Sequence, residues 1–173
     1  MNLFIVLLRV IHIFTAAYWA GGTFFVLAVL LPTVQESGPD GGKFMQRLGM
    51  SGRLSRNFAI ASGLNILTGL AAYVLIPTYR GNPFASFGPA AVLTIGAVFG
   101  LLAFLHGTFV TSPVARRSGA LAKQMAARQG PPDPEQLKEA QALGARLGTN
   151  AMHSAILIAL ALLGMAAAEF FSF

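Results

Sequence analysis

Four long apolar segments constrain the fold of this chain more than any other feature. They cover residues 3–31, 57–77, 89–112 and 150–173. A helix needs about 20 residues to cross a hydrocarbon core roughly 30 Å thick, and it satisfies its own backbone polar groups in lipid. We therefore predict an all-α protein, in which a bundle of four transmembrane helices forms one integral membrane domain over residues 1–173.

The composition agrees with a protein that has the lipid bilayer as its main partner. Hydrophobic residues make up 55% of the chain and charged residues only 10%, with a mean hydropathy of +0.65, whereas a soluble domain carries about 25% charged residues. The chain has no cysteine, which excludes disulfides, thiolate metal sites and iron–sulfur clusters. The net charge of +6 is explained by where the basic residues lie, so we predict no nucleic-acid partner.

The basic residues are concentrated in two connections, residues 32–56 and 113–149. These hold ten of the twelve lysines and arginines: Lys43, Arg47, Arg53, Arg56, Arg116, Arg117, Lys123, Arg128, Lys138 and Arg146. The opposite side has only Arg9 and Arg80. Because positive residues stay in the cytoplasm, we predict a multi-pass protein of a bacterial-type cytoplasmic (inner) membrane, with both termini outside and both large loops cytoplasmic.

The second basic connection has the signals of a helical hairpin. Asp133 is a candidate N-cap, followed by Pro134 at the first helical position and Glu135 in the first turn. We expect the fourth helix to begin near Pro134, and the third to continue past Pro113 before a turn at "GPPDP". This predicts a cytoplasmic helical hairpin extension between the third and fourth transmembrane helices.

The first basic connection suggests a different element. It contains the basic amphipathic stretch "GGKFMQRLGMSGRLSR", for which we predict a helix lying on the membrane surface. Pro32 is expected to end the first transmembrane helix.

All three histidines lie in predicted spans, where a polar group is costly unless it faces a partner or a cavity. His106 lies six residues from the cytoplasmic end of its span, about 9 Å, and His153 three residues, about 4 Å. His12 is nineteen residues from Leu31, about 28 Å. The three therefore cannot form one compact metal centre, and a pair of His106 and His153 is expected, with His12 separate.

A cofactor between His106 and His153 would have imidazole ligands. Two histidines on facing helices are a recurrent arrangement for haem iron, and small residues that would leave room for a macrocycle lie nearby: Ala103, Gly107, Ala151 and Ala155, with Ala61, Asn65 and Gly69 on the second helix. Small residues also permit tight helix packing. Copper is the alternative ligand, although the chain has no MxxM or HxH cluster.

One face of the first helix carries polar residues at helical spacing: Arg9, His12, Ala16, Trp19 and Thr23. We expect this face to point inward. An ion pair between Arg9 and Glu169 is one explanation for the arginine. Alternatively, Arg9 binds a haem propionate, with His12 as iron ligand and Met165 level with it across the bundle. His12 otherwise serves as a proton or hydrogen-bond partner for Asn65, Thr68 or a small molecule.

Residues Gly96 to Gly100, "GAVFG", match the GxxxG pattern. This pattern permits close approach of two helices. We favour packing within the bundle, with a homodimer as the alternative.

The stretch "IHIFTAAYWAGGTFFVLAVLLP" resembles the first helix of CopD-like and HemJ-like small membrane proteins. Their first span often has a histidine, a short apolar stretch, a tryptophan and a glycine pair, as His12, Trp19, Gly21 and Gly22 do here. The resemblance covers one helix and the general architecture. It implies association with haem b, protoporphyrinogen oxidation or copper uptake. The chain departs from HemJ-type enzymes because its lysines all lie in loops and none is intramembrane.

Three functions follow as hypotheses. The first is a haem-b-binding membrane protein that transfers electrons, with a quinone or a redox protein as partner. The second is a copper-handling, transporter-like protein. The third is an accessory subunit of a membrane complex, in which the histidines are structural.

Overall fold

The computed structural model describes residues 3–75, 89–128, 130–131 and 133–171, and the side chains of Glu169 and Phe171 are outside this description. The described residues form helices and no strands, as predicted for an all-α protein. The helices are α1 (Leu3–Phe25), η1 (Val26–Leu30), α2 (Leu31–Glu36), α3 (Gly38–Ser51), α4 (Arg53–Leu75), α5 (Pro89–His106), η3 (Gly107–Thr111), α6 (Ser112–Ala127), α7 (Pro134–Ala167) and η4 (Ala168–Phe171).

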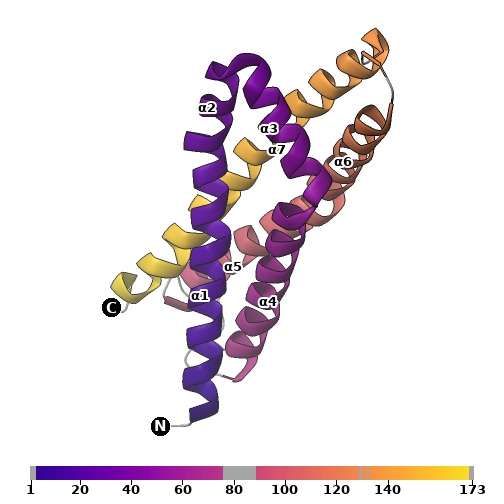
Figure 1. Ribbon diagram of the computed structural model, residues 1–173. Helices are drawn as coiled ribbons and strands as arrows, with labels where there is room; N and C mark the ends of the chain where they lie inside the picture. Colours follow the sequence, from indigo (N-terminus) through magenta and orange to yellow (C-terminus); the bar gives the residue numbers. More distant parts are fainter. Residues whose placement is uncertain (1–2, 76–88, 129, 132, 172–173) are drawn as a thin grey trace.

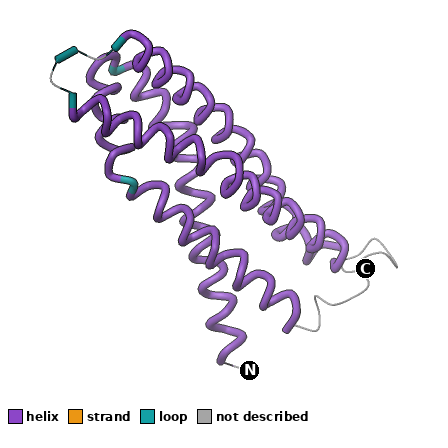
Figure 2. Tube along the Cα trace, turned by 90° about the vertical axis from the view of Figure 1, so that its right-hand side faces the viewer, coloured by secondary structure: helices purple, strands orange, loops and turns teal. Residues whose placement is uncertain are grey.

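Four of the continuous helical segments are long and apolar enough to cross a membrane. They are Leu3–Glu36, Arg53–Leu75, Pro89–Ala127 and Pro134–Ala167. This agrees with the four predicted spans, except that the last two residues of the span 57–77 and of the span 150–173 lie outside the described residues. The start of α1 and the end of α7 lie toward the same end of the molecule (Figures 1 and 2).

The bundle consists of two long antiparallel pairs of helices. In one pair, α1 and α2 run in one direction, and α3 and α4 return along them (Figure 1). In the other, α5 and α6 run out and α7 returns. The most extensive interfaces join α5 to α7 and α1 to α4. A buried cluster of Ala20, Ala103 and Ile158 joins the two pairs, with Trp19 packed against it.

The prediction that Pro32 ends the first helix is wrong. A π-helical turn, η1, precedes the proline, and α2 continues to Glu36. The same device recurs in the third helix, where η3 precedes Pro113 and α6 continues to Ala127, as predicted. Proline lacks an N–H and clashes with the carbonyl four residues earlier, and the wider π turn explains how each helix continues through it.

The stretch predicted as a membrane-surface helix forms α3, and it packs against another helix of the protein. The Nε2 amide of Gln46 donates a hydrogen bond to the Ala122 carbonyl of α6, at 3.3 Å. A methyl group added at Gly119 of α6 would lie 2.9 Å from the Gly49 carbonyl oxygen of α3. Gly52 then separates α3 from α4 with a φ of 61°, which glycine adopts without strain. α3 therefore contacts α6 on one side, and its placement on the membrane surface stays a prediction.

The start of α7 follows the capping signals. The Asp133 carboxylate accepts a hydrogen bond from the Glu135 amide at 3.0 Å, and Pro134 is the first helical residue. Near this end, the Arg117 Nε of α6 donates to the Glu139 carboxylate of α7 at 2.7 Å. The predicted start of the fourth helix is thus confirmed.

Glycines bring α5 and α7 into backbone contact. A methyl group added at Gly164 would lie 2.7 Å from the Gly96 Cα atom, and one added at Gly96 would lie 2.9 Å from the Met165 nitrogen. Such close approach requires glycine on both helices. The GxxxG match therefore packs within the bundle, as favoured.

Candidate functional site

His12 lies against α4, in a network of hydrogen bonds between α1 and α4. Its Nδ1 atom is 3.0 Å from the Asn65 carbonyl oxygen and 3.3 Å from the Thr68 hydroxyl. The Asn65 side-chain amide returns a hydrogen bond to the His12 carbonyl at 2.9 Å and lies 3.3 Å from the Thr15 hydroxyl. The prediction that His12 is a hydrogen-bond partner of Asn65 and Thr68 is confirmed.

The contacts of the His12 Nδ1 atom draw on both of its possible roles. The Asn65 carbonyl oxygen at 3.0 Å only accepts and calls for a proton on Nδ1, whereas the Asn65 side-chain amide at 3.3 Å donates and calls for a lone pair there. The Thr68 hydroxyl donates to the Leu64 carbonyl at 2.7 Å, which leaves its lone pairs to accept from the ring. A methyl group at Gly69 would lie 2.8 Å from the His12 Cε1 atom, so glycine makes room for the ring.

His106 and His153 lie together on α5 and α7. Their ring centres are 5.8 Å apart and the ring planes are at 76°. The Nδ1 atom of His106 is 3.1 Å from the Ser154 hydroxyl. His106 is half-buried and His153 is exposed, and the π turn η3 begins directly after His106. The prediction from sequence that His106 and His153 lie at similar depth and form a pair thus agrees with the structure. The contact of Ser154 with His106 was not predicted, although Ser154 adjoins His153.

The spacing of this pair fits two imidazoles on one metal ion. A metal–nitrogen bond of about 2 Å, with roughly 1 Å more to each ring centre, places two rings about 6 Å apart on opposite sides of one ion, and closer when they bind at an angle. The Ser154 hydroxyl can hold the Nδ1 proton of His106, which leaves Nε2 as the coordinating atom, as outer hydrogen bonds commonly do for metal ligands. No group of three or more histidine, cysteine or acidic side chains that could hold a metal ion occurs among the described residues.

Met165 lines a small cavity. The hypothesis that a haem is bound between His12 and Met165 requires this cavity to be large. The cavity has a volume of about 30 Å³ and is bounded by Ala16, Trp19, Ala20, Asn65, Gly100, Ile158, Ala161, Leu162 and Met165. This is about the share of one water molecule in the liquid. The space beside Met165 is thus much smaller than a haem, but His12 does not bound it, so the hypothesis that His12 and Met165 ligate a haem stays a prediction.

The inward face predicted on α1 is largely correct but does not include Arg9. Thr23 is buried, and His12, Ala16 and Trp19 are half-buried, whereas Arg9 is exposed. An arginine near a helix end can direct its long side chain toward the interface with water. The predicted pair of Arg9 and Glu169 involves a side chain outside the described residues, so it stays a prediction.

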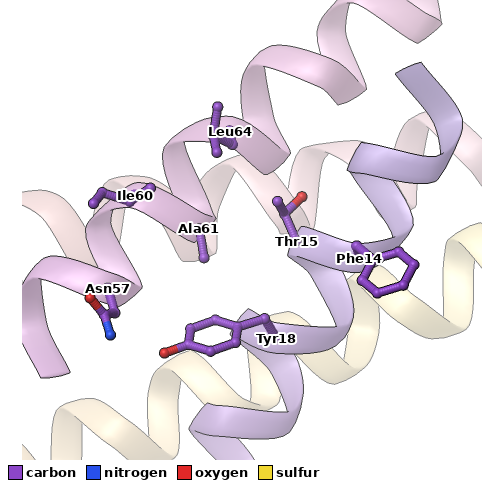
Figure 3. A pocket seen from close by; sticks show the side chains of 7 residues that line it. All are labelled: Phe14, Thr15, Tyr18, Asn57, Ile60, Ala61 and Leu64. Atoms are coloured by element: carbon purple, nitrogen blue, oxygen red, sulfur yellow. The ribbon is translucent and has the colours of Figure 1, made fainter. Parts of the chain in front are cut away.

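Two features near the helix interfaces were missed by sequence reasoning. The Tyr73 and Thr94 hydroxyls are 2.9 Å apart and join α4 to α5. A groove between α1 and α4 is lined by Tyr18 and Asn57 among others (Figure 3). Tyrosine and asparagine within apolar segments were the available signals, but which helix each would face depends on the packing.

A search of protein-family models, of curated proteins and of solved structures returned no match to this chain. The resemblance to CopD-like and HemJ-like proteins therefore stays a prediction.

Proposed function

We propose that this protein binds haem b through His106 and His153 and serves in electron transfer within the membrane. The observation that carries the proposal is the 5.8 Å separation of the two imidazole rings on neighbouring helices. When bound, haem b supplies a reversible one-electron couple. The partner in the exchange is a membrane quinone or a redox protein.

The chain contributes three things to such a site. Helices α5 and α7 hold the two rings side by side. The Ser154 hydroxyl, 3.1 Å from the His106 Nδ1, orients that ring. The apolar surroundings make it costly to leave two imidazoles without partners, so a ligand that uses both is favoured. This supports a pair of ligands more strongly than two independent structural histidines.

Copper is the second candidate because a bare ion needs no space for a macrocycle. The ring spacing suits one copper ion as well as a haem iron, and imidazole is a suitable ligand for copper. A copper-handling protein would use the same two residues. The two proposals differ in the spectrum of the bound group.

The membrane topology belongs to the same proposal. The asymmetry of lysine and arginine supports both termini outside an inner membrane, with α6 and the first part of α7 forming a cytoplasmic hairpin. A cysteine introduced as Arg117→Cys should be protected from an impermeant thiol reagent in intact cells and labelled after lysis. Gly81→Cys, outside the described residues, should be labelled in intact cells. Labelling of Arg117→Cys in intact cells would reverse the orientation.

The site is tested by an absorption spectrum of the purified protein, oxidised and reduced. We expect sharp reduced α and Soret bands, which His106→Ala and His153→Ala should each abolish or shift from low spin. His12→Gln is the matched control and should leave the bands unchanged. Unaltered bands in both α5 and α7 variants would end the assignment. Bound copper that both variants lose, with no haem bands, would select the copper-handling protein. If the purified protein contains neither haem nor copper, the remaining hypothesis is an accessory subunit with structural histidines.

A further inference from the structure

A groove between α1 and α4 opens on the surface of the bundle, next to the His12 network, whose Thr15 is one of its lining residues, and apart from His106 and His153. It has a volume of about 350 Å³ and is lined by Phe14, Thr15, Tyr18, Asn57, Ile60, Ala61 and Leu64 (Figure 3). Its rim consists of side chains that a soluble protein would bury, since Phe14 is 75% exposed and Ile60 55% exposed. Within a membrane this surface faces lipid, so the groove is open to a lipid-soluble ligand.

The groove is polar at one end and apolar at the other. The Tyr18 hydroxyl points toward the Asn57 side chain, near the start of α4, whereas Phe14 and Leu64 lie farther along the groove (Figure 3). The Thr15 hydroxyl already donates to the Ile11 carbonyl at 2.8 Å. The Tyr18 and Asn57 groups are therefore the donors that a ligand would meet, and they lie at one end only. This arrangement suits an amphiphile with a polar head and an apolar chain.

Positive charge adjoins the polar end. Arg53 is four residues before Asn57, on the face of α4 that also carries Ile60 and Leu64, and it lies about 6 Å farther along the helix axis. Arg53 and Arg56 are both exposed. Among the described residues, the ion pairs involve other arginines and lysines. A ligand with an anionic polar head would therefore bind more tightly at this end of the groove than a neutral one.

We propose that the groove binds one anionic phospholipid. Its phosphate lies at Arg53 and accepts hydrogen bonds from Tyr18 and Asn57, and one acyl chain follows Phe14, Ile60 and Leu64. A neutral amphiphile would not use the arginine. A second copy of the chain would bring the same positive charge to the same place, which opposes association. The proposal does not rest on haem or copper at the histidine pair.

The test is native mass spectrometry of the full chain, delipidated in detergent and titrated with phosphatidylglycerol or phosphatidylcholine. We expect one phosphatidylglycerol per chain, with phosphatidylcholine at least about five-fold weaker, because one basic residue near a membrane surface contributes about a five-fold gain for an anionic lipid. Arg53→Gln should weaken the binding of phosphatidylglycerol by about the same factor. Arg47→Gln, an exposed basic residue on α3, is the matched control and should not.

A second experiment fills the groove with a larger side chain. Ile60→Trp should prevent retention of the lipid, whereas Leu70→Trp should not, because Leu70 is equally exposed at 56% but lies outside the groove. Matching melting temperatures of the two variants would show that both fold. Equal retention of the two lipids, or equal effects of Arg53→Gln and Arg47→Gln, would overturn the proposal. So would displacement by millimolar inorganic phosphate, selective retention of a neutral quinone, or a dimer that Ile60→Trp dissociates.

Discussion

His12 in the α1/α4 pair and His106 with His153 in the α5/α7 pair meet the cost of burying imidazole in lipid differently. His12 directs its Nδ1 at the Asn65 carbonyl, and the Asn65 amide returns a hydrogen bond to α1. His106 and His153 lie ring beside ring, and His106 contacts the Ser154 hydroxyl. The first arrangement satisfies a polar group within the protein. The second places two imidazole rings edge to face, 5.8 Å apart, on neighbouring helices.

The two pairs of helices also differ in what holds them together. Between α5 and α7, Gly96 and Gly164 bring backbone against backbone. Between α1 and α4, Gly22 faces the Phe58 ring and Gly69 faces the His12 ring, so each contact includes a side chain that can move. The α5/α7 interface should therefore tolerate added volume less well.

The largest effect is expected from Gly164→Val. The added atoms meet the Gly96 backbone, which cannot move without separating the helices, so the free energy of unfolding should fall by about 1–3 kcal/mol or more. Gly22→Ala should cost less because the Phe58 ring can rotate away. Gly148→Val on α7 is the control, since nothing lies within 4 Å of an added Cβ. Denaturant titration in detergent micelles measures all three. Equal losses for Gly164→Val and Gly148→Val would refute the difference between the interfaces.

The hydrogen-bond network of His12 should give the next largest effect. A double-mutant cycle with His12→Ala and Asn65→Ala should yield a coupling free energy of about 0.6–1.7 kcal/mol, the range for hydrogen bonds between transmembrane helices. The single variants should each lower stability in the absence of any cofactor. Strictly additive losses would mean that the two side chains do not depend on one another.

The histidine pair should show the opposite behaviour. His153 is exposed, and substitutions at exposed positions usually change stability by less than about 0.5 kcal/mol. His153→Ala should therefore leave the unfolding free energy of the apoprotein nearly unchanged, yet remove haem or metal from the purified protein. Ser154→Ala should keep the bound group but shift its reduction potential, because only the orientation of His106 depends on that hydroxyl. A large stability loss in apo His153→Ala would make the pair structural.

Sequence reasoning reached the helices and the two histidine sites because both depend on one-dimensional information. The length of the apolar segments predicts the four spans. Counting residues from the ends of the third and fourth spans places His106 nearly level with His153. It failed where a result depends on neighbouring helices. Pro32 does not stop α1 because a π turn precedes it, and this turn has no local sequence signal. The close approach of Gly49 of α3 to Gly119 of α6 was likewise not predicted, because it depends on how the two helices pack.

Side-chain partners were predictable only in part. Asn65 was identified from its helical spacing with Ala61 and Gly69, whereas the groove at Tyr18 depends on how α1 and α4 pack. Which side of a helix faces lipid and which faces a neighbour cannot be read from a helix that is apolar nearly all round.

The smallest stability change is expected at Arg9, and it tests whether the first helix also serves a cofactor. Arg9 is exposed, and an exposed ion pair contributes at most about 1 kcal/mol. If Glu169 is its partner, Arg9→Gln and Glu169→Gln should each cost less than that amount, and the double variant should cost less than the sum of the two. If a haem propionate is the partner, Arg9→Gln should lower haem content or shift its potential, while Glu169→Gln does neither. We expect the first result because the packed α1 side has a cavity of only about 30 Å³ beside Met165. If the reduction potential changes with Arg9→Gln and not with Glu169→Gln, the propionates of a haem lie at α1. The two histidine sites would then not be separate in function.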